Sequence, residues 1–200
     1  DEARSAAMQA WAQGHRQMAA LHTGTDWGQR AFQSFRQSWE AMGGVLIGRV
    51  IIDQPAEISG QIADLLQIRQ SEQRNQRVAR ALDGNVVVQP TPRQDLDALF
   101  IAVTPQQARQ IKPTLAFQYA ADLPVYATSH VYQVGPDGQQ NADMDGIMVA
   151  EIPWLLTRDD KLYDQVTSNW PQAQGPLGRL HAMGIDAQRV FSRLPQMQQH

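Results

Sequence analysis

The alternation of short apolar runs with longer amphipathic segments constrains this chain more than any other feature of its sequence. Runs of strand length begin at Met18, Val45, Asp97, Val125 and Ile147, and segments with a helical spacing of apolar residues separate them. Helical segments between strands are typical of βαβ units, because parallel strands need a crossover connection. The sequence therefore predicts an α/β fold with a mostly parallel, Rossmann-like sheet covered by helices on both faces.

The predicted helices follow from apolar stripes and from residues that begin or end a helix. Between Trp27 and Met42 the apolar residues recur every three or four positions, as on a helix with one buried face. Asp26 is expected to cap the N-terminus of this helix. A further helix starts near Ile58, and the polar residues 69–77 either break it or continue it. The other predicted helices span residues 2–13, 105–120, 159–170 and 176–194.

The chain is expected to divide just after the Trp154–Leu156 segment. Its 200 residues suffice for one domain or one and a half, and beyond this segment the pattern predicts helices only. Turns are expected at Gly84–Asn85, ahead of a valine run, and at Gly135–Gly138. Residues 1–155 are therefore predicted to form one α/β lobe, and residues 156–200 a helical segment that belongs to a neighbouring lobe.

Composition excludes several classes of function. With 42% hydrophobic residues and a net charge of −3, the chain is expected to fold and not to bind nucleic acid through a basic surface. The absence of cysteine excludes disulfides, thiolate metal sites and cysteine nucleophiles within this sequence. No apolar run approaches the ~20 residues of a membrane-spanning helix. Because the sequence begins at Asp1 without a signal peptide, any lipid anchor is expected to lie outside it.

No motif in the sequence indicates a catalytic centre, a metal site or a cofactor. Walker A and GxGxxG patterns are absent, and the five histidines are scattered. The Asp143–Gly146 segment (DMDG) lacks the further ligands of a calcium loop and is interpreted as a turn. Ser129 and His130 are neighbours on an extended segment, so their side chains are expected to point to opposite faces. The chain is therefore predicted not to be an enzyme, with a hydrolase that uses Ser129 or Asp143 as a remaining alternative.

Two sets of residues are candidates for binding. Thr25, Asp26 and Trp27 lie between a predicted strand and a helix N-terminus, where free N–H groups suit an anion or a small polar ligand. The alternative is plain helix capping by Asp26, with Trp27 packed as a lid or as a core residue. The second set is a candidate for contact with a partner protein, and it consists of Arg69, Arg74, Arg77, Arg80 and Trp154. The arginines could also face a polyanion, or simply form a solvated helix face. Trp154 could instead pack between the lobes.

Several stretches in combination carry a resemblance to a known family. They are QDLDALFI at 94–101, TPQQARQIKP at 104–113, LPVYATS at 123–129, DMDGI at 143–147 running into IPWLL at 152–156, and GRLHAMGIDA at 178–187. With these stretches the chain resembles, over nearly its whole length, the C-terminal domain of the LppC/LpoA (YraM) lipoproteins, which are penicillin-binding protein activators of Gram-negative bacteria.

The resemblance implies a fold, a role and a location. The fold is that of a type I periplasmic binding protein, in which residues 1–155 form most of the second lobe and residues 156–200 cross back toward the first. The role is that of a regulator: a protein anchored in the outer membrane reaches through the periplasm and stimulates peptidoglycan cross-linking by a class A penicillin-binding protein, with peptidoglycan itself as a further contact. The alternative function is a solute-binding lobe for an amino acid, a peptide or a muropeptide.

Overall fold

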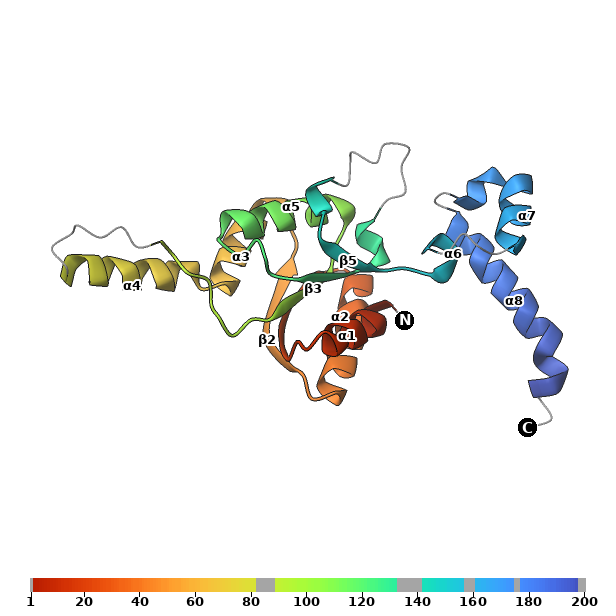
Figure 1. Ribbon diagram of the computed structural model, residues 1–200, viewed down its shortest axis with the longest axis horizontal. Coiled ribbons are helices and arrows are strands. Elements are labelled where there is room, and N and C mark those ends of the chain that lie inside the picture. Colours follow the sequence, from red (N-terminus) through yellow and green to blue (C-terminus); the bar gives the residue numbers. More distant parts are fainter. Residues whose placement is uncertain (1, 82–88, 133–141, 157–160, 175–176, 198–200) are drawn as a thin grey trace. The chain divides into compact units, whose positions relative to one another are not determined.

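The computed structural model describes residues 2–81, 89–132, 142–156, 161–174 and 177–197 (Figure 1). Internal contacts divide these residues into two compact units, of which the first comprises residues 2–132 with 142–150 and the second residues 151–197. The predicted turns at Gly84–Asn85 and Gly135–Gly138, and the valine run 86–88, lie outside the described residues.

The first unit is built on one five-stranded sheet. Its strands are β1 (Gln17–Thr23), β2 (Val45–Ile52), β3 (Ala98–Ala102), β4 (Val125–Thr128) and β5 (Ile147–Ala150). All neighbouring strands pair in parallel, in the order β2-β1-β3-β4-β5. The central strands β1, β3 and β4 are buried almost throughout, as continuous apolar runs of a parallel sheet are. The predicted α/β class with a parallel sheet is therefore confirmed.

Helices cover both faces of this sheet (Figure 1). On one face α1 (Glu2–Ala12) and α2 (Asp26–Ala41) enclose an aromatic core, and on the other α3 (Ile58–Leu65) and α5 (Pro105–Phe117) enclose an aliphatic one. Short 3-10 turns, η1 (Pro55–Glu57) and η2 (Ser129–Val131), precede α3 and follow β4. The alternation of strands and amphipathic segments in the sequence thus corresponds to a three-layer arrangement of helix, sheet and helix.

The helix predicted to start near Ile58 is interrupted and then resumes. Leu66 ends α3, Gln67 adopts a left-handed φ of 57°, and α4 spans Ile68–Ala81. The sequence left open whether the polar residues 69–77 break this helix or continue it. The break falls just before them, and a helix then continues through them. Figure 1 shows α4 leading away from α3, and only Ile68 and Ser71 of this helix are buried.

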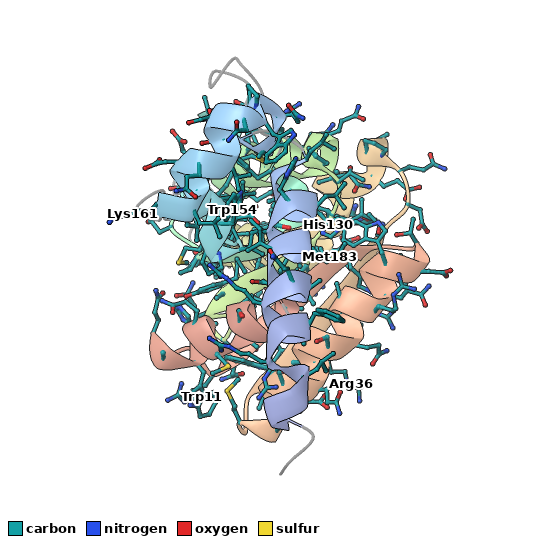
Figure 2. All side chains as sticks on the ribbon, turned by 90° about the vertical axis from the view of Figure 1, so that its right-hand side faces the viewer. Trp11, Arg36, His130, Trp154, Lys161 and Met183 are labelled. Atoms are coloured by element: carbon teal, nitrogen blue, oxygen red, sulfur yellow. The ribbon has the colours of Figure 1, made fainter. Side chains whose placement is uncertain are left out.

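The second unit is helical. It contains α6 (Pro153–Leu156), α7 (Lys161–Asn169), the 3-10 helix η4 (Pro171–Gln174) and α8 (Gly178–Met197). Trp154, labelled in Figure 2, packs against Tyr163 with ring centroids 4.9 Å apart, and its indole N–H donates to the Ala173 carbonyl at 3.4 Å. Among the described helices of both units, none combines the length and the apolar character that crossing a membrane requires.

Candidate functional site

The carboxyl edge of the sheet, where β1 and β3 end, is the first place to look for a site. From β1 the chain crosses over α2 to β2 on one side, and from β2 it returns to β3 on the other side of β1. In open parallel sheets ligands bind at such a point, because the connections diverge there and leave a crevice. Thr25, Asp26 and Trp27 follow β1 directly, so the structure places the predicted ligand residues at this edge.

The polar groups of the β1–α2 loop are largely occupied within the loop. Thr25 caps α2: its hydroxyl oxygen accepts from the Gly28 N–H at 3.4 Å and lies 2.6 Å from the Thr23 hydroxyl oxygen. The Gln29 side-chain amide donates to the Gly24 carbonyl at 3.0 Å. The prediction that Asp26 caps this helix is therefore wrong. Asp26 is instead the exposed first residue of α2, where its negative charge interacts favourably with the helix dipole.

A second loop reaches this edge from the end of β4. The Trp27 indole stacks on the His130 imidazole, with ring centroids 4.4 Å apart and an interplanar angle of 14°. Because β3 lies between β1 and β4 in the sheet, this aromatic pair joins the loops on either side of the β3 end. The structure thus brings Trp27 together with a residue that the sequence analysis did not connect to it.

Glu2, at the start of α1, fixes the β4 loop in place. Its two carboxylate oxygens accept from the Ser129 N–H at 2.8 Å and from the Ser129 hydroxyl at 2.6 Å. The His130 Nδ1 atom lies 3.9 Å from the same carboxylate. Hydrogen bonds to a charged acceptor are stronger than neutral ones. Glu2 therefore anchors Ser129, which directly precedes the histidine that carries the Trp27 stack.

The same contacts bear on the hydrolase alternative. Ser129 is only 1% exposed, and its hydroxyl donates a hydrogen bond to Glu2. Asp143 and Asp145 are exposed and flank a turn that ends at Gly146, whose φ is +83°. Within the part of the chain that the structure describes, no three histidine or acidic side chains converge on a metal position. Neither candidate is therefore joined by a base or a metal cluster among the described residues.

His22 is a buried histidine near the end of β1, close to this edge. The His22 ring is fully buried, with Nδ1 2.7 Å from the Thr23 carbonyl oxygen and Nε2 accepting from the Arg49 Nε–H at 2.9 Å. Phe32 stacks on the imidazole at 4.8 Å and also lies against the Arg49 guanidinium. Burial lowers the pKa of His22 below its ordinary value and outweighs the hydrogen bond with Thr23, which raises it; the Arg49 charge lowers the pKa further, and the Asp53 charge raises it.

The free energy of unfolding is expected to decrease as the pH is lowered, because His22 titrates. Above the ordinary pKa of 6.5 the imidazole is neutral in both the folded and the unfolded chain. Below it the unfolded chain binds a proton that the folded chain does not, so the free energy of unfolding decreases as the pH falls. Urea unfolding between pH 7.5 and 5 measures this slope. The His22→Gln variant should show a smaller slope, and an identical slope in both proteins would contradict the assignment.

The predicted partner-contact residues lie in two separate places. Arg69, Arg74, Arg77 and Arg80 are all exposed on α4 of the first unit. Trp154 is half-buried in the second unit, where it packs on α7 and η4. The arginines are therefore available to a partner, whereas part of the Trp154 ring is already used within its own unit.

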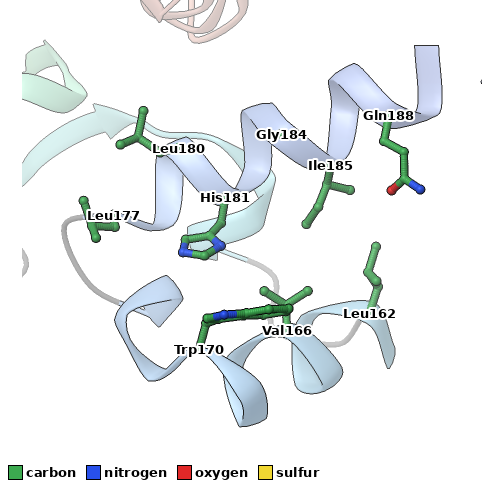
Figure 3. Close-up of a pocket in the computed structure, with 9 residues that line it drawn as sticks. All are labelled: Leu162, Val166, Trp170, Leu177, Leu180, His181, Gly184, Ile185 and Gln188. Carbon is green, nitrogen blue, oxygen red and sulfur yellow. The ribbon is translucent and has the colours of Figure 1, made fainter. Parts of the chain in front are cut away.

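The second unit contains an apolar groove between α7 and α8 (Figure 3). Its volume is about 500 Å³, and Val166, Trp170 and Ile185 contribute to its walls. Other exposed apolar side chains of α8 do not line this groove, among them Met183, which is 65% exposed, and Phe191, which is 75% exposed. Apolar exposure of this extent on a helix indicates a face that another surface covers.

Comparison with known proteins shows the family to which the chain belongs. The family model described as "LppC putative lipoprotein" matches residues 1–200. A penicillin-binding protein activator LpoA from Vibrio cholerae is 24% identical over 196 residues, which cover 98% of this chain and 32% of that protein. The chain thus spans about a third of the length of such relatives.

Solved structures agree on the fold. The LpoA (YraM) C-domain from Haemophilus influenzae, a regulator of PBP1A, is similar with a TM-score of 0.68 and 21% identity, covering 98% of this chain and 53% of that one. A protein from Chromobacterium violaceum described as a "putative branched-chain amino acid ABC transporter" is similar with a TM-score of 0.62 and 25% identity, covering 94% and 51%. The fold is therefore periplasmic binding protein-like, and the chain belongs to the LppC lipoprotein family.

Proposed function

We propose that this chain is the domain through which a lipoprotein of the Gram-negative envelope stimulates a class A penicillin-binding protein by direct contact. The observation that carries the proposal is the family match over the whole chain, together with relatives named as penicillin-binding protein activators. Stimulation of peptidoglycan cross-linking makes the protein a regulator of cell-wall synthesis, not a catalyst. The buried, hydrogen-bonded Ser129 supports a role without catalysis.

Activation has a simple thermodynamic requirement. The chain must bind the active conformation of the synthase more tightly than the inactive one, because a ligand shifts an equilibrium only by its difference in affinity for the two states. A tenfold shift requires a difference of about 1.4 kcal/mol, which a few surface contacts supply. No cofactor is needed for this mechanism.

The proposed location and division of the chain follow from the same family. The protein acts in the periplasm, held at the outer membrane by a lipid anchor outside these residues, and peptidoglycan is a second contact. Residues 1–155 form the second lobe of the binding protein-like domain, and residues 156–200 pack against the first lobe. The exposed apolar side chains of α8, such as Met183 and Phe191, support this packing, since a neighbouring lobe would bury them.

A solute-binding lobe is the second candidate function. It is favoured by the strand order, which places Thr25 and Trp27 at the edge where binding proteins of this architecture hold ligands. Against it stand the internal hydrogen bonds of the β1–α2 loop and the Trp27–His130 stack. With these groups already paired, a polar ligand gains little from them, so the contact with a protein partner is the stronger candidate.

Direct binding tests the proposal. The chain, immobilised through its C-terminus, should capture a purified class A penicillin-binding protein saturably, with an affinity that weakens as salt is added. A penicillin-binding protein without glycosyltransferase activity serves as the control partner and should not be retained. Equal retention of both proteins, or of neither, would contradict the proposed contact.

A further inference from the structure

Helix α4 combines a strong positive charge with a small contribution to the core. Its fourteen residues include four arginines and one acidic residue, Glu72, in a chain whose net charge is −3. Only Ile68 and Ser71 are buried, and Asn75 and Ser71 tie the helix to the segment that follows it through hydrogen bonds to Gln89 and Thr91. Most of the surface of α4 is therefore not used by the fold itself.

Helical geometry gathers the arginines on the side opposite the buried residues. At ~100° of rotation per residue, Arg69, Arg80, Arg77 and Arg74 fall within an arc of ~140°. Ile68 and Ser71 lie on roughly the opposite side of the helix. Arg74, Arg77 and Arg80 follow one another at spacings of three residues, which places neighbouring Cβ atoms about 5–6 Å apart. The arginine face, defined here as these four arginines, thus looks away from the core.

The charge of this face is not neutralised by the described residues. Arg69 lies 3.4 Å from Asp64, but both side chains are more than half exposed, and such a pair contributes little. Arg74, Arg77 and Arg80 form no ion pair with any residue that the structure describes. Glu72 is rotated by ~140° or more from Arg74 and Arg77. As far as the described residues are concerned, the guanidinium groups of these three arginines are therefore available to anionic groups of a partner.

We propose that the arginine face of α4 is the surface that docks on the penicillin-binding protein, and that it binds an acidic segment there with several carboxylates in a row. This inference rests on the proposed function, since it names the surface for the same contact. Arginine suits this role because its planar guanidinium binds a carboxylate through two parallel hydrogen bonds. An acidic helix or strand presents carboxylates at a spacing that matches the row of Arg74, Arg77 and Arg80.

The composition of α4 argues against a lipid surface as the occupant. Helices that lie on membranes carry a broad apolar face of leucine, phenylalanine or tryptophan beside their basic residues. On α4 the single large apolar side chain that is well exposed is Val78, at 48%. A protein surface with carboxylates is therefore the better match.

The test compares charge-reversal variants in the binding assay with a purified class A penicillin-binding protein. The triple variant Arg74→Glu, Arg77→Glu, Arg80→Glu should weaken binding at least tenfold and flatten its dependence on salt. The control variant Arg4→Glu, Arg30→Glu, Arg36→Glu makes the same change of net charge at exposed positions of α1 and α2 and should bind within twofold of the unmodified chain. A variant with lysine at the same three positions keeps the positive charge. It should bind the synthase more tightly than the charge-reversal variant but less tightly than the unmodified chain.

The outcomes separate this inference from the proposed function. If the unmodified chain fails to bind, the proposed function is wrong, whereas equal binding by the unmodified chain and the α4 variant overturns the arginine face alone. Equal weakening by both triple variants also overturns it, because the effect would then be one of net charge. Loss of binding to isolated peptidoglycan or to anionic phosphatidylglycerol vesicles, with synthase binding unchanged, would assign the face to those anions instead. Circular dichroism and urea unfolding confirm that each variant is folded.

Discussion

Replacement of Phe35 by alanine should lower the free energy of unfolding by about 3–5 kcal/mol, as large-to-small changes at fully buried aromatic positions do. Phe35 on α2 is 0% exposed. Its ring stacks on Phe100 of β3 with centroids 4.1 Å apart and also on Trp39 at 5.9 Å. The alanine variant leaves a cavity between α2 and the sheet, so both the transfer free energy and the contacts with these two rings are lost.

The chain offers a matched control for this change. Phe117, at the end of α5, is 76% exposed in the same unit. Phe117→Ala removes the same atoms from a side chain that is mostly exposed to water, so it should change the free energy of unfolding by about 0.5 kcal/mol or less. Urea unfolding followed by circular dichroism measures both variants. Similar losses for Phe35→Ala and Phe117→Ala would show that α2 does not pack on the sheet as described.

Replacement of Gly28 by alanine should destabilise the chain by about 1–3 kcal/mol, although alanine is the better helix former. A Cβ atom at Gly28 would lie 2.3 Å from the Thr23 hydroxyl oxygen and 2.5 Å from the Thr23 carbonyl oxygen. One of these atoms belongs to the backbone of β1, so α2 must move away from the strand end. That movement would also disturb the cap that Thr25 provides.

Gly60 on α3 gives the opposite expectation for the same substitution. Nothing lies within 4 Å of a Cβ atom built there. Gly60→Ala should therefore stabilise the chain by about 0.4–1 kcal/mol, because alanine loses less backbone entropy on folding. Thermal unfolding of the two variants in parallel gives the sign directly. A stabilised Gly28→Ala variant would contradict the close approach of α2 to the end of β1.

Much of the fold could be predicted because its strands are buried on both faces. Such strands are continuous apolar runs, and β2 and β4 begin at Val45 and Val125, where the sequence predicts them to begin. Errors arose where two residues compete for one role. Thr25 and Asp26 are both good helix caps, and only the backbone conformation decides that the threonine hydroxyl faces the free N–H groups.

The arrangement at the strand ends could be predicted only in part. The position of Thr25 and Trp27 follows from the order of strand and helix, but the stack of Trp27 on His130 depends on a tertiary contact between distant segments. The same holds for Glu2 and Ser129, which are 127 residues apart in the sequence. The one local signal for the role of Glu2 is its position as an acidic residue in the first turn of α1. A favourable interaction with the helix dipole explains that position equally well.

The arginine row of α4 illustrates the difference between a pattern and its surroundings. Its spacing is visible in the sequence, yet a row of charges usually forms a plain solvated face. The structure adds that the opposite side of α4 supplies its few core contacts and that three of the arginines have no ion-pair partner among the described residues. Burial and pairing, which depend on tertiary structure, single out this surface.

Peptidoglycan cross-linking by a purified class A penicillin-binding protein, supplied with lipid-linked precursor, tests the central claim most directly. Muropeptide analysis after digestion should show a larger cross-linked fraction when this chain is present than when an unrelated periplasmic protein replaces it. The increase should saturate at the chain concentration that saturates binding. An unchanged cross-linked fraction at a saturating concentration of folded chain would contradict the claim that this domain carries the activating contact.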